Sequence, residues 1–330
     1  MRSWVCNTLT GESGLSLETR TRPACGAEQV RVRNHAAALN FPDTLITRGL
    51  YQLELEPPFV PGSEFAGTII EVGAHVADFR VGQRVLALTG YDAFSEEVLV
   101  TPPGQQLHRI PAEMPFTDAA GFNLTYGTAM HALTQRARLD RDETLLVLGS
   151  AGGCGSAAVQ IGTAIGARVI AAASTEPKCR AARTMGATDT INYGIEDLRT
   201  RLLELTDGAG ADVIFDPVGG SLFDQAKRCT AWNGRYLVVG FAGGDIPQLG
   251  INYTILKSIS VIGVAYGLSA IKDPAANIAN FQQLFDWYGD GRIKPLVGAT
   301  YPLEALPEAC VALWERRATG KTVITFTTHS

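Results

Sequence analysis

Residues 149–155 read GSAGGCG, and the interpretation of the second half of the chain depends on this stretch. Its glycines stand at positions 149, 152 and 155, whereas the familiar dinucleotide-binding pattern G-x-G-x-x-G requires a glycine where Ser150 stands. The apolar run TLLVLG leads into the stretch and predicts a buried strand, and SAAVQIGTAIGA follows with helical spacing. A glycine-rich turn between a strand and a helix presents backbone N–H groups and a positive dipole end to phosphates. We therefore interpret residues 149–155 as a phosphate-binding loop; the alternative is a glycine-rich turn that binds no ligand.

The alternation of strands and helices continues as far as residue 265. Runs that predict strands are TLLVLG, RVIAAAS, TDTINY, ADVIFDPVGG, GRYLVVGF and SISVIGVAYG, and segments with helical spacing separate most of them. Strands that alternate with helices form right-handed units and a parallel sheet. The sequence therefore predicts an α/β fold with a doubly wound, Rossmann-type parallel sheet whose first turn is the glycine-rich loop.

The first third of the chain has a different sequence pattern, in which short runs of alternating apolar and polar residues are separated by Gly and Pro. EQVRVRNHAAALN, EFAGTIIEVGAHV and QRVLALT predict strands of a mostly β domain. A helical pattern begins near Asp118 in PFTDAAGFNLTYGTAMHALTQRARL, and the tail carries a helix flanked by two strands. Because this tail could rejoin the first domain, we expect one domain from residues 1–122 with 266–330 and a second from 123–265.

The strand RVIAAAS bears on the choice between NAD and NADP. Dinucleotide sites for NAD usually end this strand with a carboxylate that holds the ribose 2′-hydroxyl, but here it ends in Ala173 and Ser174. The hydroxyl of Ser174 and the ammonium of Lys178 suit a 2′-phosphate instead, which favours NADPH. Glu176 argues against this unless it only places a charge in the first turn of the next helix. Lys178 and Arg180 have a second interpretation, as part of a solvated helix face.

Composition excludes several classes of protein. The formal net charge is −5 and no Lys/Arg run occurs, which argues against a nucleic-acid partner. No apolar run reaches the roughly 18 residues that a membrane span needs. The N-terminal MRSWVCNTLTGESG lacks the apolar core of a signal peptide. The six cysteines form no C-x-x-C pair and are expected to be reduced thiols, so we expect a cytoplasmic protein.

Seven segments resemble the medium-chain dehydrogenase/reductases, and within them the zinc-independent quinone oxidoreductases. The segments are ALNFPDTLITRGLY, PGSEFAGTIIEVG, VGQRVLAL, NLTYGTAMHAL, VLGSAGGCGSAAVQIG, FDPVGG and GKTVITF, so the resemblance covers nearly the whole chain. It implies that the β-rich domain is a GroES-like catalytic domain and that the second domain binds the cofactor. It also implies a homodimer that pairs through a late strand of the cofactor domain, here SISVIGV.

The resemblance implies that no metal is bound. Zinc alcohol dehydrogenases of this superfamily carry a cysteine where this chain has Asn40, and Gly-His-Glu where it has Gly62, Ser63 and Glu64. No cysteine lies between residues 25 and 154, and the five histidines show no metal-ligand spacing. Without a Lewis acid an alkoxide is poorly stabilised, but reduction of an electron-poor acceptor does not need that help.

Site residues follow from the same resemblance. Tyr51, Asn40 and Asp43 match the catalytic cleft, Tyr51 as a possible hydrogen-bond or proton donor to the acceptor. The alternatives are an aromatic wall for Tyr51 and a turn or cap residue for Asp43. The expected cofactor-binding residues are Asn40, Thr125, Thr128, Ser150, Ala151, Gly152, Gly153, Cys154, Gly155, Ser174, Lys178, Tyr193, Gly263, Val264 and Lys321.

These observations predict an NADPH-dependent enzyme that reduces quinones by hydride transfer without zinc. Its partner would be a small electrophilic acceptor, a quinone or an enone. One alternative is an NADPH-dependent reductase of C=C bonds in enones, alkenals or enoyl-thioesters. Another is an NADPH-binding protein with little turnover. No Ser-His-Asp or Cys-His arrangement supports hydrolase chemistry.

Overall fold

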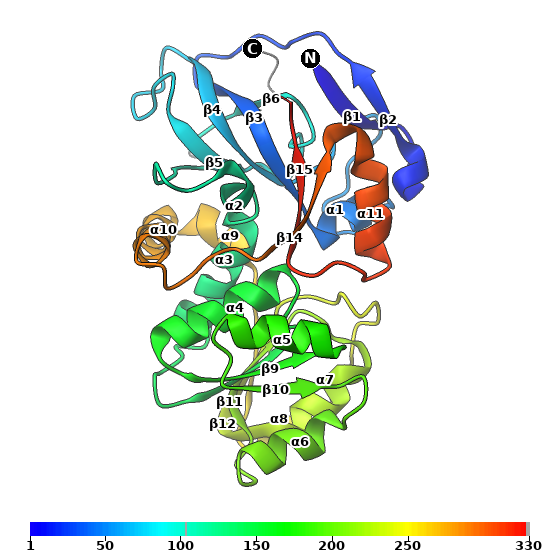
Figure 1. Ribbon diagram of the computed structural model, residues 1–330, viewed down its shortest axis with the longest axis vertical. Coiled ribbons are helices and arrows are strands. Elements are labelled where there is room, and N and C mark those ends of the chain that lie inside the picture. The colour runs from blue at the N-terminus through cyan, green and yellow to red at the C-terminus, as the bar shows by residue number, and fades with distance from the viewer. Residues whose placement is uncertain (103, 328–330) are drawn as a thin grey trace. The chain divides into compact units, whose positions relative to one another are not determined.

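The computed structural model describes residues 1–102 and 104–327, which form two compact units (Figure 1). Unit 1 comprises Met1–Leu124, Ala270–Pro274 and the chain from Pro295 onward. Unit 2 comprises Thr125–Ser269 and Ala275–Lys294. Each unit has its own sheet and its own apolar core.

Unit 1 is built on a mostly antiparallel sheet. In sheet order its strands are β14 (Val297–Pro302), β15 (Lys321–Thr325), β3 (Val30–Leu39), β4 (Glu64–Val72), β5 (Arg84–Leu88) and β7 (Gln106–Arg109). β6 (Glu97–Val100) pairs with β3, and β1 (Arg2–Cys6) pairs with β2 (Leu15–Thr19). The helices are η1 (Gly11–Gly14), α1 (Phe41–Ile46), α2 (Phe116–Ala120), η4 (Leu303–Ala305) and α11 (Leu306–Trp314).

The two ends of the chain meet in unit 1. β15, near the C-terminus, pairs antiparallel with β3, and α11 contributes Leu306 and Ala309 to the same core as Phe65 of β4. The predicted strand, helix and strand of the tail are therefore present, as β14, α11 and β15. Alternating apolar residues on β3 to β6 supply the rest of this core, because one face of an antiparallel sheet is buried.

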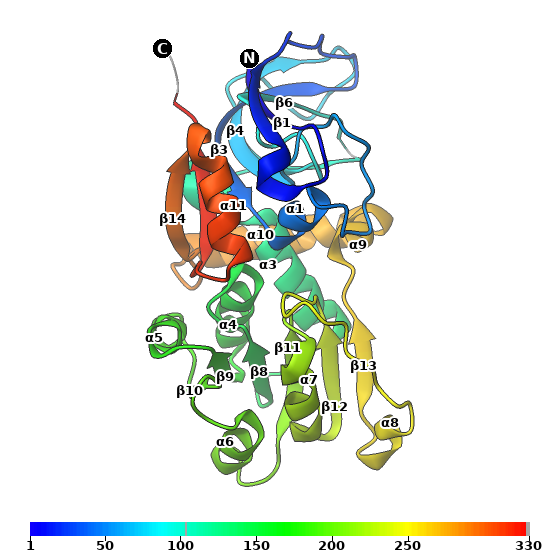
Figure 2. The ribbon, with the colours of Figure 1, turned by 90° about the vertical axis from the view of Figure 1, so that its right-hand side faces the viewer.

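Unit 2 carries the predicted doubly wound parallel sheet. Its order is β10 (Asp189–Asn192), β9 (Arg168–Ala173), β8 (Thr144–Leu148), β11 (Ala211–Asp216), β12 (Thr230–Val238) and β13 (Ser260–Gly263), and all pairs are parallel. Figure 2 shows the strands side by side in this order. The three strands β8, β9 and β11 are almost fully buried, which explains their continuous apolar runs.

The remaining helices lie wholly or mainly in unit 2. They are α3 (Asn123–Met130), the π-helical turn η2 (His131–Arg136), α4 (Gly153–Ile165), α5 (Glu176–Thr184), α6 (Leu198–Leu205), α7 (Gly220–Ala226), η3 (Lys227–Cys229), α8 (Tyr253–Leu256), α9 (Tyr266–Lys272) and α10 (Pro274–Gly289). Of these, α3, α9 and α10 each extend by at most a few residues into unit 1. Leu198 and Leu202 of α6 and Phe223 of α7 share one core cluster with Leu146 of β8, so α6 and α7 cover the same face of the sheet. The last apolar run, SISVIGVAYG, forms a shorter strand than predicted, because α9 begins at Tyr266.

The compact units divide the chain at places that differ from the expected domain boundaries. Residues 123–124 group with unit 1, whereas residues 266–269 and Ala275–Lys294, which we expected with the N-terminal domain, group with unit 2. The backbone N–H of Lys294 donates to Gln160 Oε1 of α4 at 2.6 Å, and the Arg292 guanidinium donates to the carbonyl of Ala164. Local sequence pattern gave no sign of these contacts, which join positions more than 120 residues apart.

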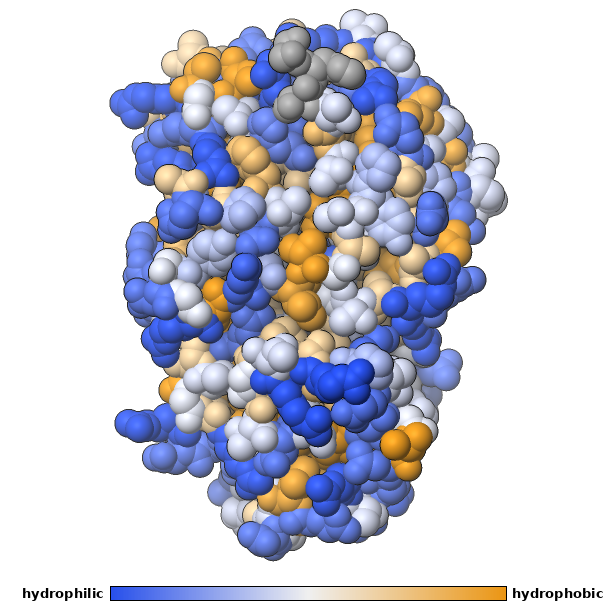
Figure 3. Space-filling view, in the orientation of Figure 1, coloured by the Kyte–Doolittle hydropathy of each residue, from blue (hydrophilic) through white to orange (hydrophobic). Residues whose placement is uncertain are grey.

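Among the described residues, no helix has the length and apolar character of a membrane span. Figure 3 shows one face of both units, on which apolar side chains form small, separate groups among hydrophilic ones.

Candidate active site

The glycine-rich loop joins β8 to α4, as predicted. Gly149 has a φ of +58°, a left-handed backbone that favours glycine. A Cβ on Gly155 would lie 2.2 Å from the carbonyl oxygen of Gly149, so no larger residue fits there. The N–H of Ser150 donates to Ala172 O of β9 at 3.0 Å, which anchors the loop to the sheet. The turn thus takes its positive φ from the first glycine and needs none at position 150.

The residues around the loop fit a phosphate group. Gly152 is the N-cap of the 13-residue helix α4, provides no side-chain cap, and no acidic residue lies in the first turn. The hydroxyl of Ser150 is fully buried and has no hydrogen-bond partner within the described part of the chain. A helix start without a cap and an unsatisfied hydroxyl are both groups that an anion would satisfy.

A second turn packs against this loop, and sequence reasoning assigned it no role. Asp216, at the end of β11, accepts hydrogen bonds from the N–H groups of Val218 and Gly219, each at 2.8 Å, and from the Tyr236 hydroxyl at 2.6 Å. Burial raises the pKa of Asp216. A Cβ on Gly149 would lie 2.8 Å from Val218, so Asp216 fixes a turn that touches the glycine loop. The sequence did contain an indication of this turn, namely a carboxylate, Asp216, at the end of an apolar strand.

The residues expected to bind the 2′-phosphate of the cofactor lie near the end of β9. Ser174 follows β9, and Lys178 lies in the first half of α5. The N–H of Tyr193 donates to Ala173 O at 3.0 Å, so Tyr193 stands beside this strand end. Glu176 pairs with Arg180 at 3.8 Å and Arg183 at 3.3 Å. Its carboxylate is therefore engaged along its own helix.

The other expected cofactor residues of unit 2 lie on two elements. Thr125 and Thr128 are buried on α3. Gly263 ends β13, and the N–H of Val264 donates to Val238 O of β12 at 3.0 Å. Both residues therefore stand at the carboxyl end of the parallel sheet, where the glycine loop also leaves β8.

Unit 1 contains a buried polar cluster, formed by Asn40, Glu64 and Lys321. The Lys321 ammonium donates to Asn40 Oδ1 at 2.6 Å, to Glu64 Oε1 at 3.0 Å and to Leu39 O at 3.4 Å. Asn40 Nδ2 donates to Glu64 Oε1 at 2.9 Å, and the N–H of Leu124 donates to Glu64 Oε2 at 2.8 Å. Glu64 is wholly buried and Lys321 is 4% exposed. The ammonium therefore has three acceptors, two of them in the cluster and the third the backbone carbonyl of Leu39.

Asp43 extends the cluster. Its Oδ2 accepts the backbone N–H of Asn40 at 2.7 Å, a bond that caps α1, and its Oδ1 accepts a hydrogen bond from the Ser63 hydroxyl. Burial raises the pKa of Asp43 to about 6, against the lowering effect of these two hydrogen bonds. The cap interpretation of Asp43 is therefore realised in the structure.

The structure thus brings together Asn40, Asp43 and Lys321, which the sequence placed in one site. Ser63 and Glu64 join them, although they entered the sequence analysis only as the counterparts of the His-Glu pair of zinc enzymes, with Ser63 in place of the histidine. The signal for Glu64 was a carboxylate within the otherwise apolar strand EFAGTIIEV. Tyr51 lies half-buried after α1, next to Leu50, whose side chain is 63% exposed.

The part of the chain that the structure describes contains no cluster of side chains that could bind a metal ion. No set of three or more His, Cys, Asp or Glu side chains there stands close enough to hold an ion.

Comparison with known proteins places these features in a family. A model of the alcohol dehydrogenase GroES-like domain matches residues 26–112, and a model named zinc-binding dehydrogenase matches residues 153–287. The quinone oxidoreductase-like protein 2 homolog of Nematostella vectensis is 37% identical over 325 residues, 98% of this chain and 88% of that protein. A 2-haloacrylate reductase of a Burkholderia species is 32% identical over 313 residues, 91% of each chain.

Among solved structures, the quinone oxidoreductase of Escherichia coli in complex with NADPH matches with a TM-score of 0.91. It is 27% identical, and the match covers 98% of this chain and all of that one. The matches to these relatives extend along nearly the full length of the chain. The chain belongs to the quinone oxidoreductases of the medium-chain dehydrogenase/reductase superfamily.

Proposed function

We propose that this protein is an NADPH-dependent oxidoreductase that reduces quinones by hydride transfer without zinc. The observation that carries the proposal is the glycine loop at the start of α4, with its uncapped helix start and the buried, unpartnered hydroxyl of Ser150. The E. coli relative, whose structure is described as a complex with NADPH, supports the choice of cofactor. The loop residues 150–155 would hold the pyrophosphate.

The preference for NADPH over NADH rests on the end of β9. Ser174 and Lys178 would bind the 2′-phosphate, and Tyr193 stands beside the same strand end. Glu176, the carboxylate that could have bound a 2′-hydroxyl, is engaged with Arg180 and Arg183. Thr125, Thr128, Gly263 and Val264 would contact the nicotinamide end.

NADPH, when bound, supplies the hydride. The chain's own residues bind and orient the reactants and exclude water. Lys321 and Glu64 fix both ends of the Asn40 amide, so Asn40 acts as a positioning residue. Asp43 holds a proton beside the Ser63 hydroxyl below a pH of about 6. Asn40 and Ser63 offer an amide and a hydroxyl where zinc enzymes offer a thiolate and an imidazole, and neither is a usual zinc ligand.

Tyr51 is assigned as a hydrogen-bond or proton donor to the acceptor. Tyr51→Phe should lower kcat with a quinone by roughly tenfold to a hundredfold, since a positioned donor contributes at least that much. The dissociation constant for NADPH should stay unchanged in a fluorescence titration. Tyr91→Phe, which alters another partly exposed tyrosine of unit 1, is the matched control. Unchanged turnover in Tyr51→Phe would leave Tyr51 as an aromatic wall.

The acceptor is tested by following NADPH oxidation by absorbance with a benzoquinone, an enone and an enoyl-thioester, before and after dialysis against a chelator. The proposal expects the quinone to react fastest and the chelator to change nothing. The 32% identity to a 2-haloacrylate reductase supports the second candidate, reduction of an activated C=C bond. Faster oxidation by the enone or thioester would select that candidate. Tight NADPH binding with no turnover would select a binding protein.

We also propose a homodimer that forms at the free edge of β13. β13 ends the sheet of unit 2, and Val261 on it is 40% exposed. Nearby positions expose further apolar side chains, namely Ile251, Ile255 and Leu256. Sedimentation should give twice the mass of one chain, and Val261→Lys should lower it to one; a wild-type monomer would contradict the dimer. The six free cysteines favour the cytoplasm, which fractionation of cells would test.

A further inference from the structure

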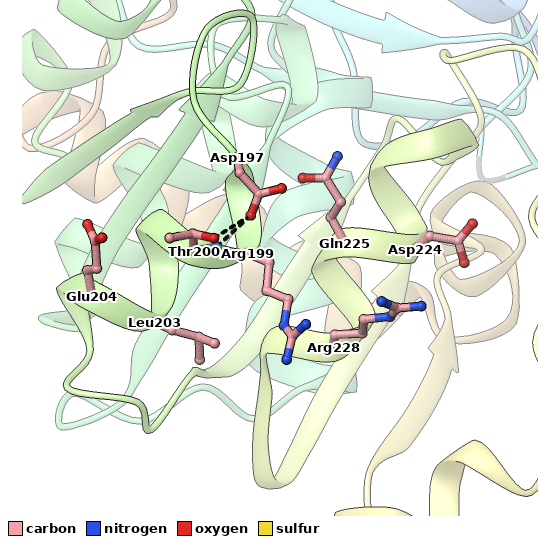
Figure 4. A pocket seen from close by; sticks show the side chains of 8 residues that line it. All are labelled: Asp197, Arg199, Thr200, Leu203, Glu204, Asp224, Gln225 and Arg228. Carbon is pink, nitrogen blue, oxygen red and sulfur yellow. Dashed lines mark hydrogen bonds between the residues drawn. The ribbon is translucent and has the colours of Figure 1, made fainter.

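Unit 2 contains a surface pocket that the proposed cofactor site does not use. It has a volume of about 680 Å³, within the range typical of small-molecule sites. α6, α7 and the short turn η3 supply its lining, which Figure 4 shows: Asp197, Arg199, Thr200, Leu203, Glu204, Asp224, Gln225 and Arg228. The glycine loop, by contrast, belongs to the β8–α4 junction.

The three carboxylates of the lining are already satisfied. Asp197 caps α6 by accepting the N–H and the hydroxyl of Thr200, each at 2.8 Å. Asp224 pairs with Lys227 at 2.5 Å, and Glu204 pairs with Arg201 at 2.9 Å. These hydrogen bonds lower the pKa of Asp197 and of Asp224, so both are ionised and committed at neutral pH.

The two arginines of the lining, unlike its carboxylates, have no hydrogen-bond partner for their guanidinium groups among the described residues. Within the described residues, the guanidinium groups of Arg199 and Arg228 form no ion pair and no hydrogen bond. Figure 4 shows the Arg199 side chain extending from α6 toward the segment that carries Arg228, whereas the Arg228 side chain turns toward the side on which Asp224 lies. The pocket therefore holds two guanidinium groups whose N–H donors have no acceptor in the part of the chain that the structure describes, although their charges act at longer range on the carboxylates of Asp197 and Asp224.

Neutral groups complete the lining. Gln225 Oε1 accepts the N–H of Leu198 at 3.1 Å, which fixes the amide and leaves its NH₂ group as a donor. Leu203 adds an apolar contact surface. A ligand would thus meet two guanidinium forks, one amide donor and one aliphatic side chain.

We propose that this pocket is a second binding site, for a small organic phosphate monoester. A phosphate monoester carries a charge of about −1.5 to −2 at pH 7, which matches two guanidinium groups better than a single carboxylate does. The planar guanidinium fork also matches phosphate oxygens in a bidentate geometry.

Isothermal titration of the full-length protein with ribose 5-phosphate tests the site, with NADPH saturating so that the glycine loop is blocked. Ribose without phosphate is the ligand control. The double variant Arg199→Gln/Arg228→Gln should weaken binding at least tenfold. Arg22→Gln/Arg317→Gln removes the same charge from two arginines that pair with carboxylates outside the pocket lining, and it should bind as the wild type does.

Three results would overturn the proposal: no binding by the wild type, equal binding by both double variants, or equal binding of ribose and its phosphate. Arg199 and Arg228 are exposed, so their replacement should leave the thermal unfolding temperature unchanged, and a thermal scan verifies this. The result is independent of which acceptor the enzyme reduces.

Discussion

Lys178 carries the charge that we propose sets the preference for NADPH over NADH. It lies in α5, close after Ser174, at a strand end that has no carboxylate for a ribose hydroxyl. If its ammonium binds the 2′-phosphate, Lys178→Ala should weaken NADPH binding roughly tenfold to a hundredfold, since hydrogen bonds to charged groups contribute about 1.5–3 kcal/mol. The affinity for NADH should hardly change.

Fluorescence titration of both cofactors measures this difference. Arg183→Ala removes a cation from the same helix that already pairs with Glu176, so it should leave the ratio of the two affinities as it is. Equal losses of NADPH and NADH affinity in Lys178→Ala would place Lys178 on a solvated helix face.

Asp43 makes stability depend on pH. Its pKa is raised from an ordinary 3.8 to about 6, so the folded protein holds a proton that the unfolded chain has released between these values. The free energy of unfolding should therefore fall as the pH rises through this window, by roughly 3 kcal/mol at 1.36 kcal/mol per pKa unit. Asp43→Asn removes this pH dependence. The free energy of unfolding of the variant minus that of the wild type should therefore be larger at pH 7.5 than at pH 5.

Urea unfolding at the two pH values tests the prediction. Asp207→Asn, at an exposed turn, should keep the pH dependence of the wild type. The idea fails if Asp43→Asn and the wild type differ by the same amount at both pH values.

At the scale of elements, the β8–loop–α4 unit was predictable because its signals are local. A buried apolar run, spaced glycines and a helical pattern lie within about 22 consecutive residues, and each needs only its neighbours. The parallel direction of the strands in unit 2 was predictable too, because it follows from the alternation of strands and helices along the chain. The short length of β13 was not predictable, because an exposed edge strand ends where pairing with β12 ends.

Gly155 tests the local account. Gly155→Ala would place a methyl group against the backbone carbonyl of Gly149, and the carbonyl cannot move without displacing the loop. We expect NADPH affinity to fall at least tenfold, together with some loss of thermal stability. Gly267→Ala is the control, because a Cβ there meets no atom within 4 Å. NADPH titration and thermal unfolding measure both effects, and wild-type affinity in Gly155→Ala would contradict the fit.

At the scale of the whole chain, the sequence could not show which residues meet. Lys321 and Glu64 are 257 positions apart, and Lys321 and Asn40 are 281 apart. Only the return of β15 to β3 brings them together. The family resemblance placed Asn40 and Lys321 in one site, but neither periodicity nor spacing indicated that the ammonium is saturated by buried acceptors.

This cluster predicts a non-additive effect on stability. Lys321→Met leaves the Glu64 carboxylate buried without its counter-ion, which should cost about 3–5 kcal/mol of unfolding free energy. The double variant Glu64→Gln/Lys321→Met removes the unpaired charge and should be more stable than Lys321→Met alone. Urea unfolding of the wild type, of Glu64→Gln, of Lys321→Met and of the double variant forms a double-mutant cycle. Strictly additive losses would mean that the pair is not coupled.

The pairing of β15 with β3 also has a consequence for the newly synthesised chain. On the edge of β3 that faces away from β4, residues Ala36–Leu39 pair with Thr322–Thr325, so this edge stays open until residue 325 has been translated. Unit 2 is complete once residue 294 has emerged, whereas unit 1 must wait, with much of its sheet already made and a row of backbone N–H and C=O groups unpaired. On the ribosome, the first domain to begin is the last to finish.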